Sequence, residues 1–156
     1  ISPGARLSLD FRVKIVRGSA IEEVRFGDLL TRRTLVSVFM KNKTPSCDRQ
    51  TASLAAHADE LERAGYNLVA ISRDTAGSHL RRTAVLGSGV TWVSDPDDQF
   101  ARATDSLVEK SMYGRTFIGP QRAAYVLDRE GTVMAVAEKV DTADHAAQLR
   151  ALIKTL

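Results

Sequence analysis

Cys47 is the only cysteine among the 156 residues of this chain, and it lies in the polar segment TPSCDRQ, residues 44–50. The thiolate form of cysteine is a nucleophile, and a helix N-terminus or a neighbouring cation stabilises that form. An apolar run precedes the segment and a helical pattern follows it. We therefore expect Cys47 in the first turn of a helix, where unpaired N–H groups and the helix dipole favour an anion. Three residues earlier, the Thr44 hydroxyl can both donate and accept a hydrogen bond, which suits a substrate with two bonded oxygens, such as a peroxide.

A buried structural role is the alternative for a lone cysteine, because free cysteine often behaves as a small hydrophobic residue. The polar neighbours of Cys47 argue against an apolar pocket, and Arg49 partly offsets the charge of Asp48. A disulfide reductase normally uses Cys-x-x-Cys, whereas position 50 is Gln. The one cysteine excludes an intrachain disulfide, and the three histidines lack metal-ligand spacing, so we expect no bound metal.

The hydrophobic pattern around this segment alternates between predicted strands and predicted helices. The predicted strands cover residues 8–16, 21–26, 35–39, 67–72, 90–93, 123–127 and 133–140. The predicted helices cover residues 47–64, 75–85 and 142–153, a short helix ends at 103, a turn covers 87–89, and residues 104–120 show no clear periodicity. We therefore predict an α/β fold with a central mixed sheet flanked by helices, an N-terminal β-hairpin, and a ligand site where the parallel strands end.

Composition is that of a single globular domain. The apolar fraction of 44% and the charged fraction of 26% are ordinary, and 156 residues can bury one core, so we expect one domain over residues 1–156. The net charge of +3 comes from basic residues scattered among acidic ones, which argues against a nucleic-acid partner. No apolar run reaches the length of a membrane span and a lone thiol favours a reducing compartment, so we expect no membrane partner and a cytoplasmic location. The first residue is Ile1 rather than Met, so we also expect that an upstream segment was removed.

Several segments of the chain, taken in order, resemble the peroxiredoxin family. The segment around Cys47 is similar to the family's peroxidatic-cysteine motif, most of all to that of the peroxiredoxin Q, or bacterioferritin-comigratory, subfamily. The remaining similar segments are AISRD (70–74), VSDP (93–96), EKSMYGR (109–115) and GPQRAAYVLDREG (119–131). The resemblance covers most of residues 35–140 and implies a thioredoxin-like fold.

The resemblance also implies a role for individual residues. Cys47 would be the peroxidatic cysteine, Thr44 would bind and orient the peroxide, and Arg122 would lie near the sulfur and favour the thiolate. Further residues of the substrate pocket would be Pro45, Ser46, Gln50 and Met40. Relatives usually carry a proline where this chain has Met40, so the resemblance implies a less rigid loop here.

The activity implied is thiol-dependent reduction of hydrogen peroxide and small organic hydroperoxides, without a cofactor. The Cys47 thiolate would become a sulfenic acid. Many relatives carry a second cysteine five residues later, where this chain has Ala52. We therefore expect a small thiol, a thioredoxin-like protein or a partner cysteine to reduce the sulfenic acid, and we expect a monomer or weak dimer. The alternative from another class is a divergent redox sensor or binding module with little peroxidase activity.

Overall fold

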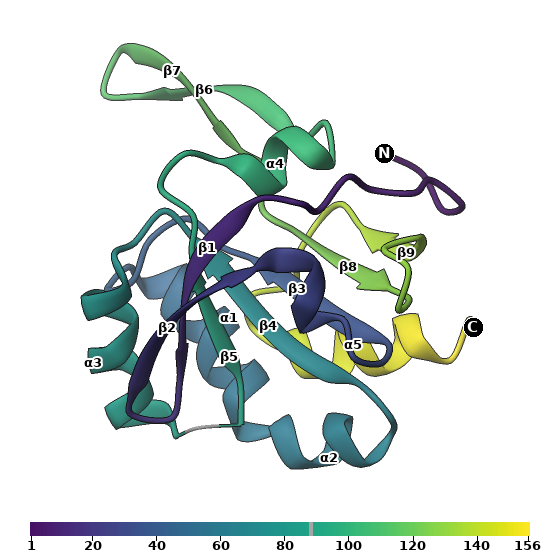
Figure 1. The fold of residues 1–156 in the computed structure, drawn as a ribbon. Coiled ribbons are helices and arrows are strands. Elements are labelled where there is room, and N and C mark those ends of the chain that lie inside the picture. Colours follow the sequence, from purple (N-terminus) through teal and green to yellow (C-terminus); the bar gives the residue numbers. More distant parts are fainter. Residues whose placement is uncertain (88) are drawn as a thin grey trace.

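A mixed seven-stranded sheet forms the centre of the computed structural model, which describes residues 1–87 and 89–156 (Figure 1). Its strands are β1 (Arg12–Arg17), β2 (Ala20–Arg25), β3 (Thr34–Val38), β4 (Asn67–Ser72), β5 (Thr91–Ser94), β8 (Ala123–Leu127) and β9 (Val133–Ala137). They lie in the order β2-β1-β5-β4-β3-β8-β9. Strands β3, β4 and β5 are parallel to one another, and the other neighbours in the sheet are antiparallel. The fold confirms the predicted central mixed sheet and the predicted N-terminal hairpin, β1–β2.

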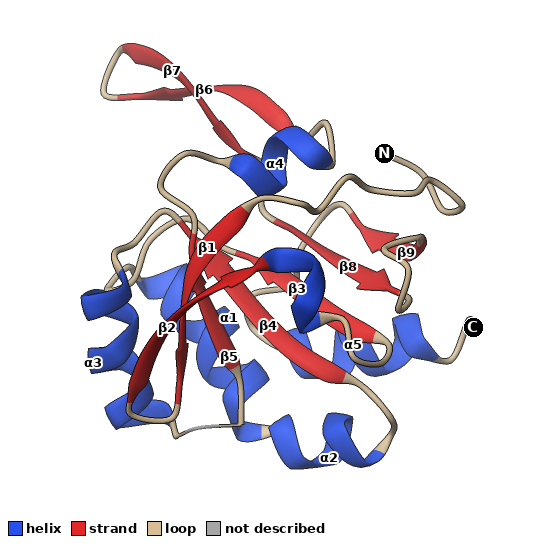
Figure 2. Cartoon of the chain, in the orientation of Figure 1, coloured by secondary structure: helices blue, strands red, loops and turns tan. Residues whose placement is uncertain are grey.

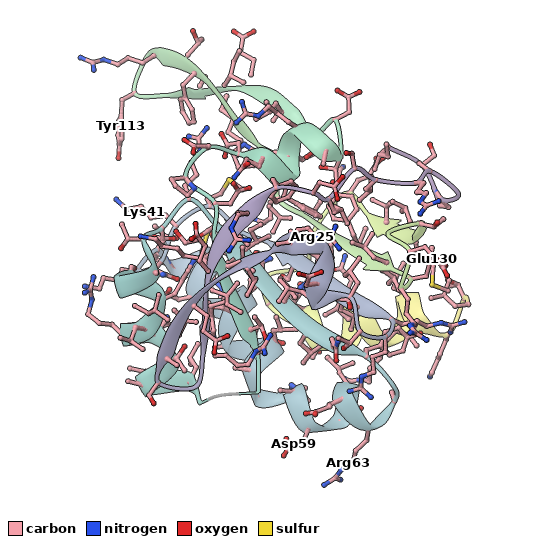
Figure 3. All side chains as sticks on the ribbon, in the orientation of Figure 1. Arg25, Lys41, Asp59, Arg63, Tyr113 and Glu130 are labelled. Atoms are coloured by element: carbon pink, nitrogen blue, oxygen red, sulfur yellow. The ribbon has the colours of Figure 1, made fainter. Side chains whose placement is uncertain are left out.

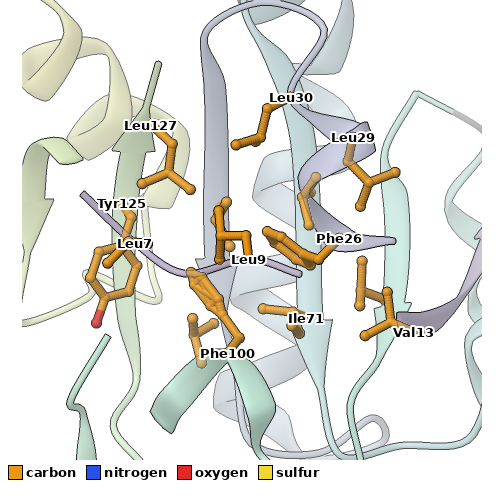
Figure 4. Packing of buried hydrophobic residues seen from close by; sticks show 14 of the residues in the cluster. Leu7, Leu9, Val13, Phe26, Leu29, Leu30, Ile71, Phe100, Tyr125 and Leu127 are labelled. Carbon is orange, nitrogen blue, oxygen red and sulfur yellow. The ribbon is translucent and has the colours of Figure 1, made fainter. Parts of the chain in front are cut away.

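Helices cover the two faces of this sheet unequally (Figure 2). The helices are α1 (Pro45–Ala56), α2 (Ala58–Arg63), α3 (Ala76–Leu86), α4 (Gln99–Ala103) and α5 (His145–Ile153), with a 3-10 helix at Phe26–Leu29. Side chains of α1, α2, α3 and α5 pack in one apolar cluster, around Leu54 and Trp92. The N-terminal segment, the 3-10 helix and α4 pack in the other cluster, where Phe26 lies against Phe100 (Figure 4).

Strand β3 lies between β4 and β8, and all five of its residues are buried. Leu35 contributes to the apolar cluster on the helical face, whereas Val36 contributes to the cluster on the opposite face. A strand covered on both faces needs apolar residues at successive positions, which is the pattern that predicted it. The chain leaves β3 at Val38 and enters α1 at Pro45, so the segment that carries Cys47 lies at the carboxyl end of a central strand.

Two predictions about the elements were wrong. The predicted helix over 47–64 is interrupted at His57, whose φ of −112° and ψ of 17° are not helical, so α1 and α2 are separate. Residues 104–120, predicted to lack regular structure, contain an antiparallel hairpin of β6 (Leu107–Met112) and β7 (Arg115–Pro120). This hairpin projects from the body of the protein (Figure 1). Because neither of its strands packs into the main sheet, its residues lack the apolar alternation from which strands are predicted.

Helix α3 ends at Leu86, in agreement with the predicted helix, and Gly87 follows with a φ of 92°. Ser88, in the predicted turn over 87–89, lies outside the described residues. Among the described residues, no helix is both long enough and apolar enough to cross a membrane.

Candidate active site

Cys47 lies in the first turn of α1, as predicted from the segment around it. Thr44 precedes the helix in an extended conformation, and Pro45 is the first helical residue, where its fixed φ suits a helix start. The Asp48 N–H donates to the Thr44 carbonyl at 2.8 Å, which closes the first turn. Helix geometry leaves the N–H groups of Ser46 and Cys47 without an acceptor inside the helix. The cysteine is buried, with 1% of its surface exposed, at the positive end of a helix dipole.

Arg122 brings a fixed positive charge to the sulfur. Its Nη2 lies 3.1 Å from Cys47 Sγ and also donates to Ser46 Oγ at 3.2 Å. The two residues are 75 positions apart, and the sheet brings them together. Strand β8 runs antiparallel to β3 with Ala123 opposite Val38, so the start of β8 meets the end of β3 and the beginning of α1. A guanidinium held this close provides a charged hydrogen-bond donor at the sulfur.

Gln50 lies beneath this arginine. The Arg122 Nη1 donates to Gln50 Oε1 at 3.3 Å, and Gln50 Nε2 donates to Ser37 Oγ at 2.8 Å and to the Val38 carbonyl at 3.2 Å. The Gln50 side chain has no exposed surface, and its predicted place in the substrate pocket stays a prediction. Ser37, on β3, was not among the predicted site residues, since a serine in a buried strand gives no distinctive sequence signal.

The loop that precedes α1 is held in place by Asn42. Its N–H donates to Asp74 Oδ2 at 2.9 Å, and its side-chain Nδ2 donates to Ser78 Oγ at 2.9 Å and lies 3.1 Å from His79 Nδ1. The next residue, Lys43, has a φ of 65°, a left-handed conformation that is uncommon outside glycine. The loop therefore enters α1 through a left-handed turn at Lys43, and the hydrogen bonds of the buried Asn42 fix the residue before it.

Thr44 directs its hydroxyl hydrogen back to this loop, since its Oγ1 donates to the Lys41 carbonyl at 2.8 Å. The oxygen of that hydroxyl is then left with lone pairs that can accept a hydrogen bond from a substrate. Thr44, Pro45, Ser46 and Cys47 are thus together at the helix start, and Arg122 and Gln50 join them from the sheet side.

Met40 lies half-buried at the edge of the site, where the Lys110 ammonium is in contact with its sulfur. Burial lowers the pKa of Lys110, and the positive charges of Arg122 and Arg73 lower it further. Met40, Lys110 and Phe117 line part of a cavity of about 380 Å³. The sequence did not predict Lys110 as a site residue, because residues 104–120 show no periodicity from which the position of its side chain could be inferred.

Two features limit the chemistry of the site. Within the described residues, no group of three or more His, Cys, Asp or Glu side chains could hold a metal ion. The Arg122 guanidinium contacts the sulfur, and the Ser46 hydroxyl accepts a hydrogen bond from the same arginine nitrogen. The chemistry that this arrangement supports is nucleophilic attack by a thiolate on an electrophile that accepts hydrogen bonds.

Comparison with known proteins identifies the family to which this chain belongs. A family model described as the AhpC/TSA family matches residues 7–136. The chain belongs to this family, that of the peroxiredoxins. It is similar to Peroxiredoxin Bcp of Xanthomonas campestris pv. campestris, with 33% identity over 120 residues that cover 77% of this chain and 75% of the relative. It is also similar to Peroxiredoxin Bcp of Escherichia coli K12, with 31% identity over 124 residues that cover 80% of each chain.

A solved structure of the X. campestris bacterioferritin comigratory protein, studied for alkyl peroxide reduction, has the same fold. Its TM-score with this peroxiredoxin is 0.85, at 27% identity, with 98% of each chain covered. The predicted family, the thioredoxin-like α/β fold and the thiol-dependent peroxidase class are thereby confirmed. The roles of the individual site residues stay predictions, which the geometry above makes specific.

Proposed function

We propose that this peroxiredoxin reduces hydrogen peroxide and small organic hydroperoxides with the Cys47 thiolate as nucleophile. The observation that carries the proposal is the contact of 3.1 Å between Arg122 Nη2 and Cys47 Sγ in the first turn of a helix. A related protein whose structure matches this one is described by its alkyl peroxide reduction activity, which supports the substrate class.

The first step oxidises the sulfur. The Cys47 thiolate attacks one peroxide oxygen in line with the O–O bond, so that an S–O bond forms as the O–O bond breaks. The sulfur loses two electrons and becomes a sulfenic acid, while the departing oxygen takes up a proton and leaves as water or an alcohol. Thr44 Oγ1 accepts a hydrogen bond from the peroxide, because its own hydrogen is committed to the Lys41 carbonyl.

In the transition state, negative charge develops on the peroxide oxygens, close to hydrogen-bond donors that are already in place. The Cys47 N–H has no acceptor within the helix, and Arg122 adds a charged donor, so both stabilise the transition state without reorganisation. Ser46 accepts one Arg122 donor and fixes its direction. Pro45, at the exposed first position of α1, and Met40, at the edge of the loop, border the approach to the sulfur.

The sulfenic acid is returned to the thiol by an external thiol, because Cys47 is the only cysteine of the chain. A first thiol forms a mixed disulfide with Cys47 and releases water, and a second thiol displaces Cys47 and leaves as a disulfide with the first. The reductant is a low-molecular-weight thiol or a thioredoxin-like protein. Such a cycle suits a reducing compartment such as the cytoplasm.

We infer a monomer or weak dimer as the working form. Permanent interfaces are large and apolar, whereas the exposed large apolar side chains of the described residues are few. Those that are neighbours in the fold are Leu107, Tyr113, Phe117 and Ile118, all in the 107–120 hairpin.

Stopped-flow mixing of the reduced protein with hydrogen peroxide, and separately with tert-butyl hydroperoxide, tests the proposal. The remaining thiol is measured after each delay, and Cys47→Ser provides the blank. We expect a second-order rate far above that of free cysteine, and a rate equal to that of free cysteine would contradict the proposal. Fast oxidation that no thiol can turn into a catalytic cycle would support the alternative of a redox sensor.

A further inference from the structure

A buried histidine is connected to the sulfur through a continuous set of hydrogen bonds. His145, the first residue of α5, has no exposed surface, and its Nε2 lies 2.8 Å from Ser37 Oγ on β3. The same hydroxyl accepts from Gln50 Nε2 at 2.8 Å, and Gln50 Oε1 accepts from Arg122. Since Arg122 reaches Cys47, four side chains from α5, β3, α1 and the start of β8 form one connected group beneath the sulfur. We call this group, Ser37, Gln50, Arg122 and His145, the floor of the site.

The directions of these hydrogen bonds follow from what each atom can do. The Val38 carbonyl only accepts, so the Gln50 atom facing it is the amide nitrogen, and Arg122 only donates, so the Gln50 atom facing it is the oxygen. The second N–H of the Gln50 amide then goes to Ser37 Oγ. The Ser37 hydrogen is left free, and His145 Nε2 is the acceptor within reach.

His145 can accept this hydrogen only as a neutral ring with its proton on Nδ1. That nitrogen lies 3.2 Å from Gln148 Oε1, an acceptor for the N–H, and the Gln148 amide in turn donates to the Lys139 carbonyl at 2.6 Å. Burial lowers the pKa of His145 and outweighs the opposing effects of the Gln148 hydrogen bond and of Asp141, so the neutral ring is favoured. All donors in the series therefore point away from Arg122, so each bond polarises the next in the same sense.

Without the acceptor on His145, the Ser37 hydrogen would be buried and unpaired, which is costly. A flip of the Gln50 amide would give the Ser37 hydrogen an acceptor, because the Gln50 oxygen would then face Ser37. That flip would point the amide nitrogen at Arg122, donor against donor, and would also lose the bond to the Val38 carbonyl. Arg122 would then keep only Ser46 as a neutral anchor beside the sulfur.

We propose that His145 is a positioning residue of the peroxidase reaction, which accepts the Ser37 hydrogen and thereby fixes the Gln50 amide in the orientation that holds Arg122 against Cys47. The inference rests on the proposed function, because it gives His145 a role only through the Arg122–Cys47 pair.

The test compares His145→Leu with His145→Gln. Both side chains fill much of the space of the imidazole, but only glutamine offers an oxygen to Ser37. We expect the rate of Cys47 oxidation by hydrogen peroxide to fall about three- to tenfold in the leucine variant, the effect of one lost hydrogen bond. The glutamine variant should recover most of that loss. The ultraviolet absorbance of the thiolate, which reports one atom because the chain has one cysteine, should appear at higher pH in the leucine variant than in the glutamine variant.

A second comparison separates positioning from packing. Ser37→Ala removes the link between His145 and Gln50, so adding His145→Leu to it should cause no further loss of rate. Equal rates for the leucine and glutamine variants, or fully additive losses in the double variant, would overturn the inference. The wild-type rate and that of Arg122→Ala test the proposed function itself: if wild type is fast and Arg122→Ala is slow while the His145 variants behave alike, only the role of His145 is refuted.

Discussion

The floor of the site and the β6–β7 hairpin lie near the same sulfur but are built in opposite ways. In the floor, Gln50 and His145 have no exposed surface and every polar contact has a defined donor and acceptor. The hairpin projects from the body, and Tyr113 at its turn is 96% exposed (Figure 3). Two contacts connect the hairpin to the body of the protein. Arg73 donates to the Ile118 carbonyl at 3.0 Å, and the Lys110 ammonium contacts the Met40 sulfur.

The difference predicts that the floor determines the rate of the reaction, whereas the hairpin can vary with little effect on it. A buried hydrogen bond that loses one partner leaves the other unsatisfied, at a cost of about 1–3 kcal/mol, whereas an exposed group finds water instead. We therefore expect substitutions in the floor to change the rate of peroxide reduction strongly, and substitutions in the hairpin to change it little.

The largest effect is expected at Arg122. Arg122→Ala removes a charged donor aimed at the sulfur and should lower the rate of Cys47 oxidation by about 10²–10³-fold, as loss of a preorganised donor does in other enzymes. Arg122→Lys should recover little, because an ammonium cannot contact Cys47, Ser46 and Gln50 with the same planar geometry. Stopped-flow oxidation measures both, and a lysine variant as fast as wild type would show that charge alone is sufficient.

Thr44 should come next. Thr44→Val keeps the shape but removes the hydroxyl that we expect to bind the peroxide, and the oxidation rate should fall about tenfold or more. Thr44→Ser, the matched control, keeps the oxygen and should stay within a few-fold of wild type. Because the Thr44 hydroxyl also donates to the Lys41 carbonyl, urea unfolding of both variants must accompany the kinetics. Similar losses in the two variants would assign Thr44 a structural role only.

Burial should also make the stability of the interior depend on pH on the acid side. Burial lowers the pKa of His79, whose ring accepts from Asn42 and donates to the Val93 carbonyl. Above about pH 6.5 both the folded and the unfolded states are neutral at this residue. Below that pH the unfolded state takes up a proton first, so the free energy of unfolding falls by up to about 1.4 kcal/mol per pH unit, until the pH passes below the folded-state pKa.

Urea unfolding at several pH values between about 5 and 7.5 measures this slope. His79→Gln should be less stable than wild type at neutral pH but should show a shallower decline on acidification. The control His57→Gln replaces a half-buried histidine whose Nδ1 donates to the Ser53 carbonyl at 3.0 Å. A slope that is the same in wild type and His79→Gln would contradict the assignment.

The smallest effect is expected in the hairpin. Lys110→Gln removes a positive charge near Arg122 and Cys47, but the ammonium is partly exposed, so the rate should fall by no more than about threefold and less at high salt. Tyr113→Ser, at the exposed turn, should leave both the rate and the stability unchanged. A tenfold loss in Lys110→Gln would break the comparison, because it would place the hairpin within the chemistry.

Local features of the site could be predicted because they depend on residues close together in the chain. The buried strand β3, the extended Thr44 and the helix-starting Pro45 together place Cys47 in a first turn, whatever lies elsewhere. The break at His57 could not be predicted, because the apolar spacing continues across it while the backbone does not. The hairpin was missed for the opposite reason, since strands with little burial carry no alternating pattern.

By itself, the sequence predicted Cys47 as the nucleophile, its place at a helix start and reduction by an external thiol, since one cysteine and a short segment are enough for those predictions. The resemblance to peroxiredoxins pointed to Arg122, but only the tertiary structure brought it to 3.1 Å from the sulfur, by pairing Ala123 with Val38 across the sheet. The link from Gln50 through Ser37 to His145 was decided there as well, over 108 positions between serine and histidine. The physical reason is that a helix start forms from neighbours in the chain, whereas a buried polar group is satisfied only by partners that the folded sheet brings to it.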